Sequence, residues 1–154
     1  MRVAIIGGGP VGLVSGAVLA GVGHEVRVVD IDPVRTGKIA LGEAPFHEPG
    51  LPELLRSVVD AGRLTATGVA AEAVVDAAVI LICVGTPPTG SGADLTALRA
   101  ASAEVARALR GASGYRVVAV KSTVPPGTTS EVVEPILREH SGLGADSLGV
   151  GMNP

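Results

Sequence analysis

Short apolar runs alternate with longer segments of mixed polarity along the whole chain. Six apolar runs, rich in Val, Ile, Leu and Ala, have the length of buried strands: residues 2–6, 25–30, 63–67, 77–85, 115–122 and 147–154. Helical spacing or helix-start signals occupy most of the intervening segments: residues 11–21, 32–42, 52–62, 70–76, 95–111 and 130–142. This alternation predicts an α/β fold, a doubly wound (Rossmann-type) parallel sheet of about six strands with helices on both faces. Right-handed crossovers favour the strand order 3-2-1-4-5-6.

Several polar residues and prolines mark where these elements begin or break. Asp32 and Asp94 are each expected to cap the helix that follows. Pro135 predicts a kink in the last helix, or a position where the helix tolerates proline. Pro and Gly also mark residues 43–50 and 86–94 as loops.

The first strand runs into the sequence GGGPVG, residues 7–12. Its G-x-G-x-x-G spacing lies between a predicted strand and a predicted helix, which favours a dinucleotide site over a turn without a ligand. Gly7 is expected to make the tight turn, Gly9 to let the backbone approach a pyrophosphate, and Gly12 to let the helix pack on the strand. The amides at the helix N-terminus are expected to face the phosphates.

Two more residues of this loop belong to the first helical turn. Pro10 fits there because the first helical position needs no amide donor, and Val11 is predicted with it to contact the cofactor. Proline at this position is also similar to the loops of flavin enzymes. FAD is therefore the second candidate cofactor at this point.

An acidic residue at the end of the second strand completes the signature. Asp30 lies 18 residues after Gly12, where a carboxylate can accept hydrogen bonds from ribose hydroxyls. The same charge would repel a 2′-phosphate, so NAD is favoured over NADP. Asp32 competes for this role but is better explained as a helix cap. Arg35 is predicted to reach the ribose too, although its spacing fits an exposed helix cation equally well.

Composition narrows the classes of partner. With 12 basic and 15 acidic residues the net charge is −3, which gives no electrostatic basis for binding nucleic acid or an anionic membrane. A single cysteine, Cys83, excludes an internal disulfide and a Cys-based zinc cluster, and no metal site is predicted. Cys83 lies in an apolar strand, where burial is expected to keep its thiol inert. No apolar run reaches the roughly 20 residues that span a bilayer, and we expect a cytoplasmic protein.

The fourth and fifth strands end in polar, Pro-rich loops, residues 84–90 and 120–128. Ligands of doubly wound sheets bind beyond the carboxyl ends of the strands. The two loops bring the hydroxyls of Thr86, Ser122 and Thr123 to that edge. Each hydroxyl alone is typical of a turn or cap, but several converging loops predict a lined cleft.

Motifs distributed over nearly the whole chain resemble one known family. They are GHEVRVVDID (23–32), HEPGL (47–51), ICVGTPP (82–88), KSTVPPGT (121–128) and the final NP (153–154). In this order they resemble the N-terminal NAD-binding domain of the UDP-glucose/GDP-mannose dehydrogenase family. The resemblance favours NAD over FAD.

The resemblance implies an NAD-dependent oxidoreductase that converts the C6 hydroxymethyl group of a nucleotide sugar to a carboxylate and reduces two NAD. It implies that the glycine loop holds the pyrophosphate and that Asp30 and Arg35 hold the ribose. It also implies that Thr86, with Pro87, lies along the cofactor. Thr123 is implied to lie near the nicotinamide and to help position a catalytic water.

Three positions depart from the family pattern, since Pro10 and His47 replace tyrosines and Met152 replaces a small hydroxyl residue. The family's nucleophilic cysteine is not in this sequence. We therefore expect residues 1–154 to be a truncated NAD-binding domain, without the central helix and the C-terminal sugar-nucleotide domain. Alone, this domain is expected to be inactive.

Three functions stay open for the protein. UDP-glucose 6-dehydrogenase is favoured because UDP-glucose is the commoner substrate, and PFHEPGL (45–51) fits those members. GVGMNP (149–154) is similar to GDP-mannose members. A non-catalytic dinucleotide-sensing module with the same fold is the third possibility. The resemblance implies a homodimer for the full-length enzyme and no nucleic-acid or membrane partner.

Overall fold

A computed structural model describes residues 1–90 and 92–154. Its main sheet has six parallel strands in the order β3-β2-β1-β4-β7-β8. The strands are β1 (Arg2–Ile6), β2 (Glu25–Val29), β3 (Leu64–Thr67), β4 (Val79–Ile82), β7 (Arg116–Val120) and β8 (Leu148–Met152). This confirms the predicted doubly wound fold and its strand order.

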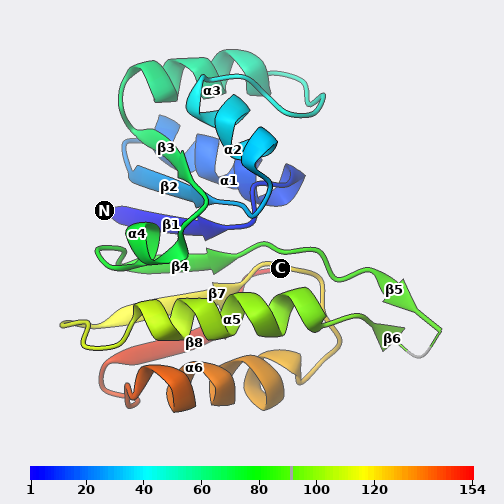
Figure 1. Cartoon of the computed structure of the whole chain (residues 1–154), viewed down its shortest axis with the longest axis vertical. Helices are drawn as coiled ribbons and strands as arrows, with labels where there is room; N and C mark the ends of the chain where they lie inside the picture. The colour runs from blue at the N-terminus through cyan, green and yellow to red at the C-terminus, as the bar shows by residue number, and fades with distance from the viewer. Residues whose placement is uncertain (91) are drawn as a thin grey trace.

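Helices cover both faces of the sheet (Figure 1). One face carries α1 (Pro10–Gly21), α2 (Pro33–Ala40) and α3 (Leu51–Asp60). The other carries α4 (Ala70–Val74), α5 (Thr96–Ala108), the π-helical turn η1 (Thr129–Val133) and α6 (Glu134–Ser141). The central strands β1 and β4 therefore alternate their side chains between two apolar cores, as parallel strands covered on both faces do.

Strand β1 shows this alternation most clearly. Val3 and Ile5 pack in the core beneath α1 and α3, whereas Ala4 and Ile6 pack in the core beneath α4 and α5. All four are at most 5% exposed. Because β1 and β4 are the two central strands of the sheet, the loops that follow them begin at the middle of its carboxyl edge.

The layer of helices that contains α1 leaves part of the sheet uncovered. Val79, Leu81 and Ala119, on β4 and β7, line an open hollow of about 650 Å³ beside α1. Val14 and Val18 of α1 line the same hollow. No helix in the described part of the chain is long and apolar enough to cross a membrane.

The structure corrects the predicted loop over residues 86–94. A small antiparallel ribbon forms there, from β5 (Pro88–Thr89) and β6 (Gly92–Ala93), and it projects from the body in Figure 1. Pro and Gly marked this segment as irregular, but the amide of Asp94 donates to the Pro87 carbonyl at 2.9 Å and closes the base of the ribbon. Ser91, within that predicted loop, lies outside the described residues.

Two predictions at helix ends also change. Leu95, not Asp94, is the N-cap residue of α5, although the Asp94 carboxylate still accepts from the Thr96 amide at 2.8 Å. At Pro135 the helix neither continues regularly nor simply bends, because a π-helical turn over Thr129–Val133 precedes α6. The wider turn ends at Val133, and Pro135 lies in the first turn of α6, where its missing amide costs no hydrogen bond within that helix.

Candidate cofactor site

The turn between β1 and α1 has a shape that only glycine fits. Gly7 has a φ of +109°, and its amide donates to the Val29 carbonyl at 2.8 Å. A Cβ on Gly7 would lie 2.7 Å from the Cys83 carbonyl oxygen. A Cβ on Gly12 would lie 1.9 Å from the Gly7 carbonyl oxygen and 3.1 Å from the Cys83 Cβ. The first and third glycines therefore let α1 pack directly against β1 and the end of β4.

The middle glycine has a different environment. A Cβ on Gly9 would meet no atom within 4 Å, so the space in front of the backbone is open. Gly9 is the N-cap residue of α1, no side chain caps this helix end, and Pro10 occupies the first helical position as predicted. The first amides of α1 therefore have no side-chain acceptor and suit an anionic ligand. Val11, in the same turn, is exposed.

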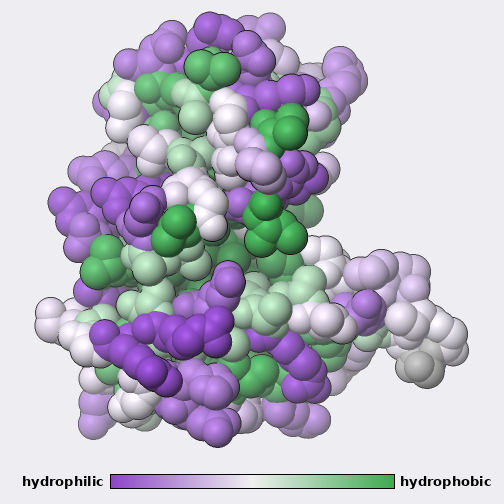
Figure 2. Space-filling view, in the orientation of Figure 1, coloured by the Kyte–Doolittle hydropathy of each residue, from purple (hydrophilic) through white to green (hydrophobic). Residues whose placement is uncertain are grey.

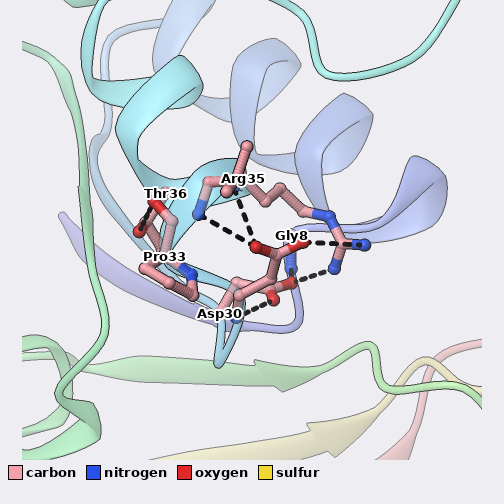
Figure 3. Close-up of polar contacts among 7 residues, drawn as sticks. Gly8, Asp30, Pro33, Arg35 and Thr36 are labelled. Atoms are coloured by element: carbon pink, nitrogen blue, oxygen red, sulfur yellow. Dashed lines mark hydrogen bonds and ion pairs between the residues drawn. The ribbon is translucent and has the colours of Figure 1, made fainter.

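Asp30 is nearly buried at the end of β2, and its carboxylate accepts hydrogen bonds from three directions (Figure 3). Its Oδ2 accepts from the Gly8 amide and from Nη1 of Arg35, each at 2.8 Å. Its Oδ1 accepts from the Asp32 amide at 2.9 Å. These bonds connect the glycine turn, the end of β2 and the start of α2.

The same contacts decide the charge of Asp30. Burial alone raises the pKa of its carboxyl, but the hydrogen bonds from Asp32, Arg35 and Gly8 outweigh burial and hold the pKa below its ordinary value. The hydrogen bond to Asp30 raises the pKa of Arg35 in turn. Asp30 is therefore ionised at neutral pH, and one negative charge faces this edge of the sheet beside a paired cation.

Asp32 acts as the predicted helix cap. Its Oδ1 accepts from the amides of Val34 and Arg35 at 2.9 and 3.3 Å. Its Oδ2 lies 3.9 Å from the Arg35 guanidinium, which reaches past it to Asp30 at 2.8 Å. Arg35 is thus an ion-pair partner at the end of β2 rather than an isolated cation on the helix surface.

Two residues of this region were missed in the sequence. Gly8 occupies a variable position of the G-x-G-x-x-G spacing, yet its amide donates to Asp30. A Cβ on Gly8 would lie 3.2 Å from the Asp30 Oδ2. Ile31 is 92% exposed although it is strongly apolar. Ile31 directly follows the acid at the carboxyl end of a strand, so its exposed side chain lies next to Asp30. Figure 2 shows apolar surface at the waist of the molecule, between the half built on β1–β3 and the half built on β4, β7 and β8.

The loops after β4 and β7 lie against each other. The Thr86 hydroxyl donates to the Thr123 carbonyl at 2.6 Å, and the buried Ser122 hydroxyl donates to the Val84 carbonyl at 2.6 Å. Thr123 itself is exposed. The structure therefore brings these predicted site residues together at the carboxyl edge, and Pro87 follows at the base of the β5–β6 ribbon.

Cys83 joins the two halves of this edge but has no reactive thiol. Its amide donates to the Ile6 carbonyl at 2.7 Å, and its side chain packs under Gly12. Burial raises the pKa of the thiol to about 11, against a smaller opposing effect of Lys121. The thiol is therefore protonated at neutral pH, which fits a packing role. His47 is exposed in its loop.

Comparison with known proteins assigns the chain to a family. Residues 1–154 match the sequence profile of the UDP-glucose/GDP-mannose dehydrogenase family, NAD binding domain. The chain belongs to this family. The family's cofactor is NAD, and the predicted preference for NAD over FAD is confirmed. The open backbone at Gly9, the uncapped start of α1 and the ionised Asp30 fit that cofactor.

Relatives in the family act on different nucleotide sugars. The chain is 42% identical over 156 residues to GDP-mannose 6-dehydrogenase of Azotobacter vinelandii, covering 100% of this chain and 36% of that protein. It is 45% identical over 139 residues to UDP-glucose 6-dehydrogenase of Pseudomonas aeruginosa, covering 90% of this chain and 30% of that protein. The chain thus spans about a third of the length of these relatives.

Solved structures of a GDP-mannose dehydrogenase and of a UDP-glucose dehydrogenase both match the fold of this chain. A ternary complex of GDP-mannose dehydrogenase from Pseudomonas aeruginosa superimposes with a TM-score of 0.96 at 41% identity, over 100% of this chain and 36% of that one. A UDP-glucose dehydrogenase from Pyrobaculum islandicum gives 0.93 at 36% identity, over 99% of this chain and 35% of that one. These structures support the family membership, and they come from enzymes named for two different sugar nucleotides.

Proposed function

We propose that residues 1–154 hold NAD for the oxidation of a nucleotide sugar at C6, with NAD as the hydride acceptor. The observation that carries this proposal is the junction between the open glycine turn and the buried Asp30 carboxylate, joined by the 2.8 Å hydrogen bond from the Gly8 amide. A pyrophosphate would bind in the turn from Gly7 to Gly12 at the amides of Gly9 and Val11, with Pro10 shaping the first helical turn, because the amides of Gly7 and Gly8 already donate to Val29 and Asp30.

Asp30 and Arg35 would bind the adenosine ribose. The Asp30 carboxylate already accepts three hydrogen bonds, and its oxygens have about four acceptor sites in all, so one site is free for a ribose hydroxyl. A 2′-phosphate would face the same ionised carboxylate. Because Arg35 is paired with Asp30, its charge is already partly neutralised, and the site favours NAD over NADP. Ile31 adds exposed apolar surface next to Asp30 for the adenine.

The loops after β4 and β7 would line the reactive end of the cofactor. Thr86 and Pro87 are proposed to lie along the cofactor. Thr123 is proposed to face the nicotinamide end of the cofactor, where its hydroxyl also helps to position a water. Thr123 is exposed at the edge of the sheet and thus accessible for that role. The raised pKa of Cys83, a half-buried thiol, argues against Cys83 as the nucleophile.

For the substrate we propose UDP-glucose, supported by the 45% identity to a UDP-glucose 6-dehydrogenase. GDP-mannose is the second candidate, because the GDP-mannose relatives align over the whole chain and one superimposes with a TM-score of 0.96. Homodimer formation and a cytoplasmic location are proposed for the longer enzyme.

The substrate proposal is tested by following NADH formation with UDP-glucose and with GDP-mannose. Residues 1–154 are assayed alone and after fusion to the remaining segment of a relative that uses each sugar nucleotide. We expect the chain alone to be inactive and the fusion with the UDP-glucose enzyme to be the more active. NADH formation by the chain alone would contradict the proposed role, and activity only with GDP-mannose would favour the second candidate.

A further inference from the structure

Two hydroxyl groups join the loops after β4 and β7 in opposite directions. Thr86, in the first loop, donates to the Thr123 carbonyl of the second at 2.6 Å. Ser122, in the second loop, donates to the Val84 carbonyl of the first at 2.6 Å. Backbone pairing between the two strands ends with the amides of Lys121 and Ser122, which both donate to the Ile82 carbonyl, at 2.8 and 3.2 Å. The hydroxyl pair therefore extends the connection beyond the sheet.

This pair holds Thr123 from both sides. Before it, Ser122 is buried and fixed by its amide and its hydroxyl. After it, the carbonyl of Thr123 itself is fixed by Thr86. The Thr123 side chain is exposed, and its hydroxyl makes no hydrogen bond within the described part of the chain. The backbone that carries this hydroxyl is thus fixed, while the hydroxyl stays available to a ligand.

The hydrogen-bonding capacity of Thr86 limits what else it can do. A threonine hydroxyl has one donor, and in Thr86 that donor points to the Thr123 carbonyl. Thr86 therefore offers a cofactor only an acceptor. A direct donor contact would require breaking the bond that holds the neighbouring loop.

We propose that Thr86 is a positioning residue, which acts on NAD through Thr123 and not by donating a hydrogen bond to the cofactor. Thr86 and Ser122 together set the distance between the two loops and the direction of the Thr123 hydroxyl. This inference rests on the proposed function, in which the Thr123 hydroxyl faces the bound cofactor.

The test uses Thr86→Val, which keeps the shape but removes the donor, and Thr86→Ser, which keeps the hydroxyl. Hydrogen exchange of the amides of residues 121–124 is measured without ligand. We expect faster exchange there in Thr86→Val, wild-type exchange in Thr86→Ser, and no change in β1. Unchanged exchange in Thr86→Val would overturn the proposal. This comparison is decisive even if the wild-type chain fails to bind NAD, which would refute the proposed function separately.

NAD affinity then separates positioning from direct contact. We expect Thr86→Val to bind NAD about fivefold more weakly, the effect of one neutral hydrogen bond, and Thr86→Ser to bind within twofold of the wild type. In a Thr123→Val background, which lacks the Thr123 hydroxyl but keeps its carbonyl, the Thr86→Val change should alter affinity less than about twofold. An equal loss in both backgrounds would show direct contact by Thr86, and no loss in either would also overturn the proposal.

Discussion

At the residue scale, Asp30 carries most of the site's chemistry. We predict that Asp30→Asn weakens NAD binding by about tenfold or more, because a hydrogen bond to a charged group contributes about 1.5–3 kcal/mol. NADP binding should weaken less or improve, because the charge that repels the 2′-phosphate is gone. Calorimetric titration with both nucleotides measures this change in preference.

Asp32→Asn is the matched control for that change. Asparagine caps a helix about as well as aspartate, and the partly exposed contact of Asp32 with Arg35, at 3.9 Å, contributes little. NAD affinity and thermal stability should therefore stay close to the wild type. If Asp32→Asn instead lost its preference for NAD over NADP, the ribose contact would belong to Asp32 and not to Asp30.

The ionised state of Asp30 also predicts a pH dependence of stability. Its pKa in the folded state lies below the ordinary value of 3.8. The carboxylate therefore contributes stability above the unfolded-state pKa, and this contribution is lost as the pH falls through the lower folded-state pKa. Denaturant unfolding from about pH 6 to pH 2 should show a larger loss for the wild type than for Asp30→Asn. Parallel losses in the two proteins would mean that Asp30 is not stabilised as a carboxylate.

Cys83 gives a chemical test of burial at the same edge. With a pKa of about 11, its thiolate is a very small fraction at neutral pH. The rate of alkylation by iodoacetamide should be far below that of a free thiol, and should keep rising through about pH 10, beyond the range where an ordinary thiol with a pKa near 8.5 levels off. A rate that is half-maximal near pH 8.5 would contradict the raised pKa of Cys83.

At the element scale, we expect two glycines of the same turn to affect different properties, Gly12 the stability of the fold and Gly9 the binding of NAD. Gly12→Ala would place a methyl 1.9 Å from the Gly7 carbonyl oxygen, so α1 would have to move away from β1. We predict a loss of about 1–3 kcal/mol or more in the free energy of unfolding. Gly9→Ala meets no atom within 4 Å, and its stability should change little, yet its methyl should obstruct the pyrophosphate and weaken NAD binding.

Urea unfolding and calorimetric titration of both variants decide this prediction. The contrast between the two glycines matters more than either value. If Gly9→Ala bound NAD as well as the wild type, the pyrophosphate would not approach this part of the backbone. If Gly12→Ala were as stable as the wild type, the close packing of α1 on the turn would be wrong.

The elements were predictable where a repeated pattern specified them. Strand and helix order followed from apolar periodicity, because each strand packs at least one face in a core and each helix covers one face of the sheet. The ribbon β5–β6 was not predictable, because its sequence has no apolar alternation and its two strands, Pro88–Thr89 and Gly92–Ala93, pair through their backbones. The Gly8–Asp30 bond was equally invisible, because an amide donor leaves no trace in the residue type. The Thr86–Thr123 bond depends on the spacing of two loops, which sequence spacing alone does not give.

At the scale of the whole molecule, the site depends on the sheet rather than on any one loop. The glycine turn follows β1, Asp30 follows β2, and the two threonine loops follow β4 and β7. These four strands are neighbours, so their carboxyl ends form one edge at which a single extended ligand can contact all four loops. A ligand bound there should also stabilise the fold, by an amount that rises with its concentration relative to Kd.

Binding of NAD to residues 1–154 is the most direct test of this account. Isothermal titration should give one site per chain with a dissociation constant below about 1 mM, within the usual range for enzyme ligands. NADP should bind more weakly than NAD. Absence of NAD binding at about 1 mM by a chain that is folded, as judged by its cooperative unfolding, would contradict the account.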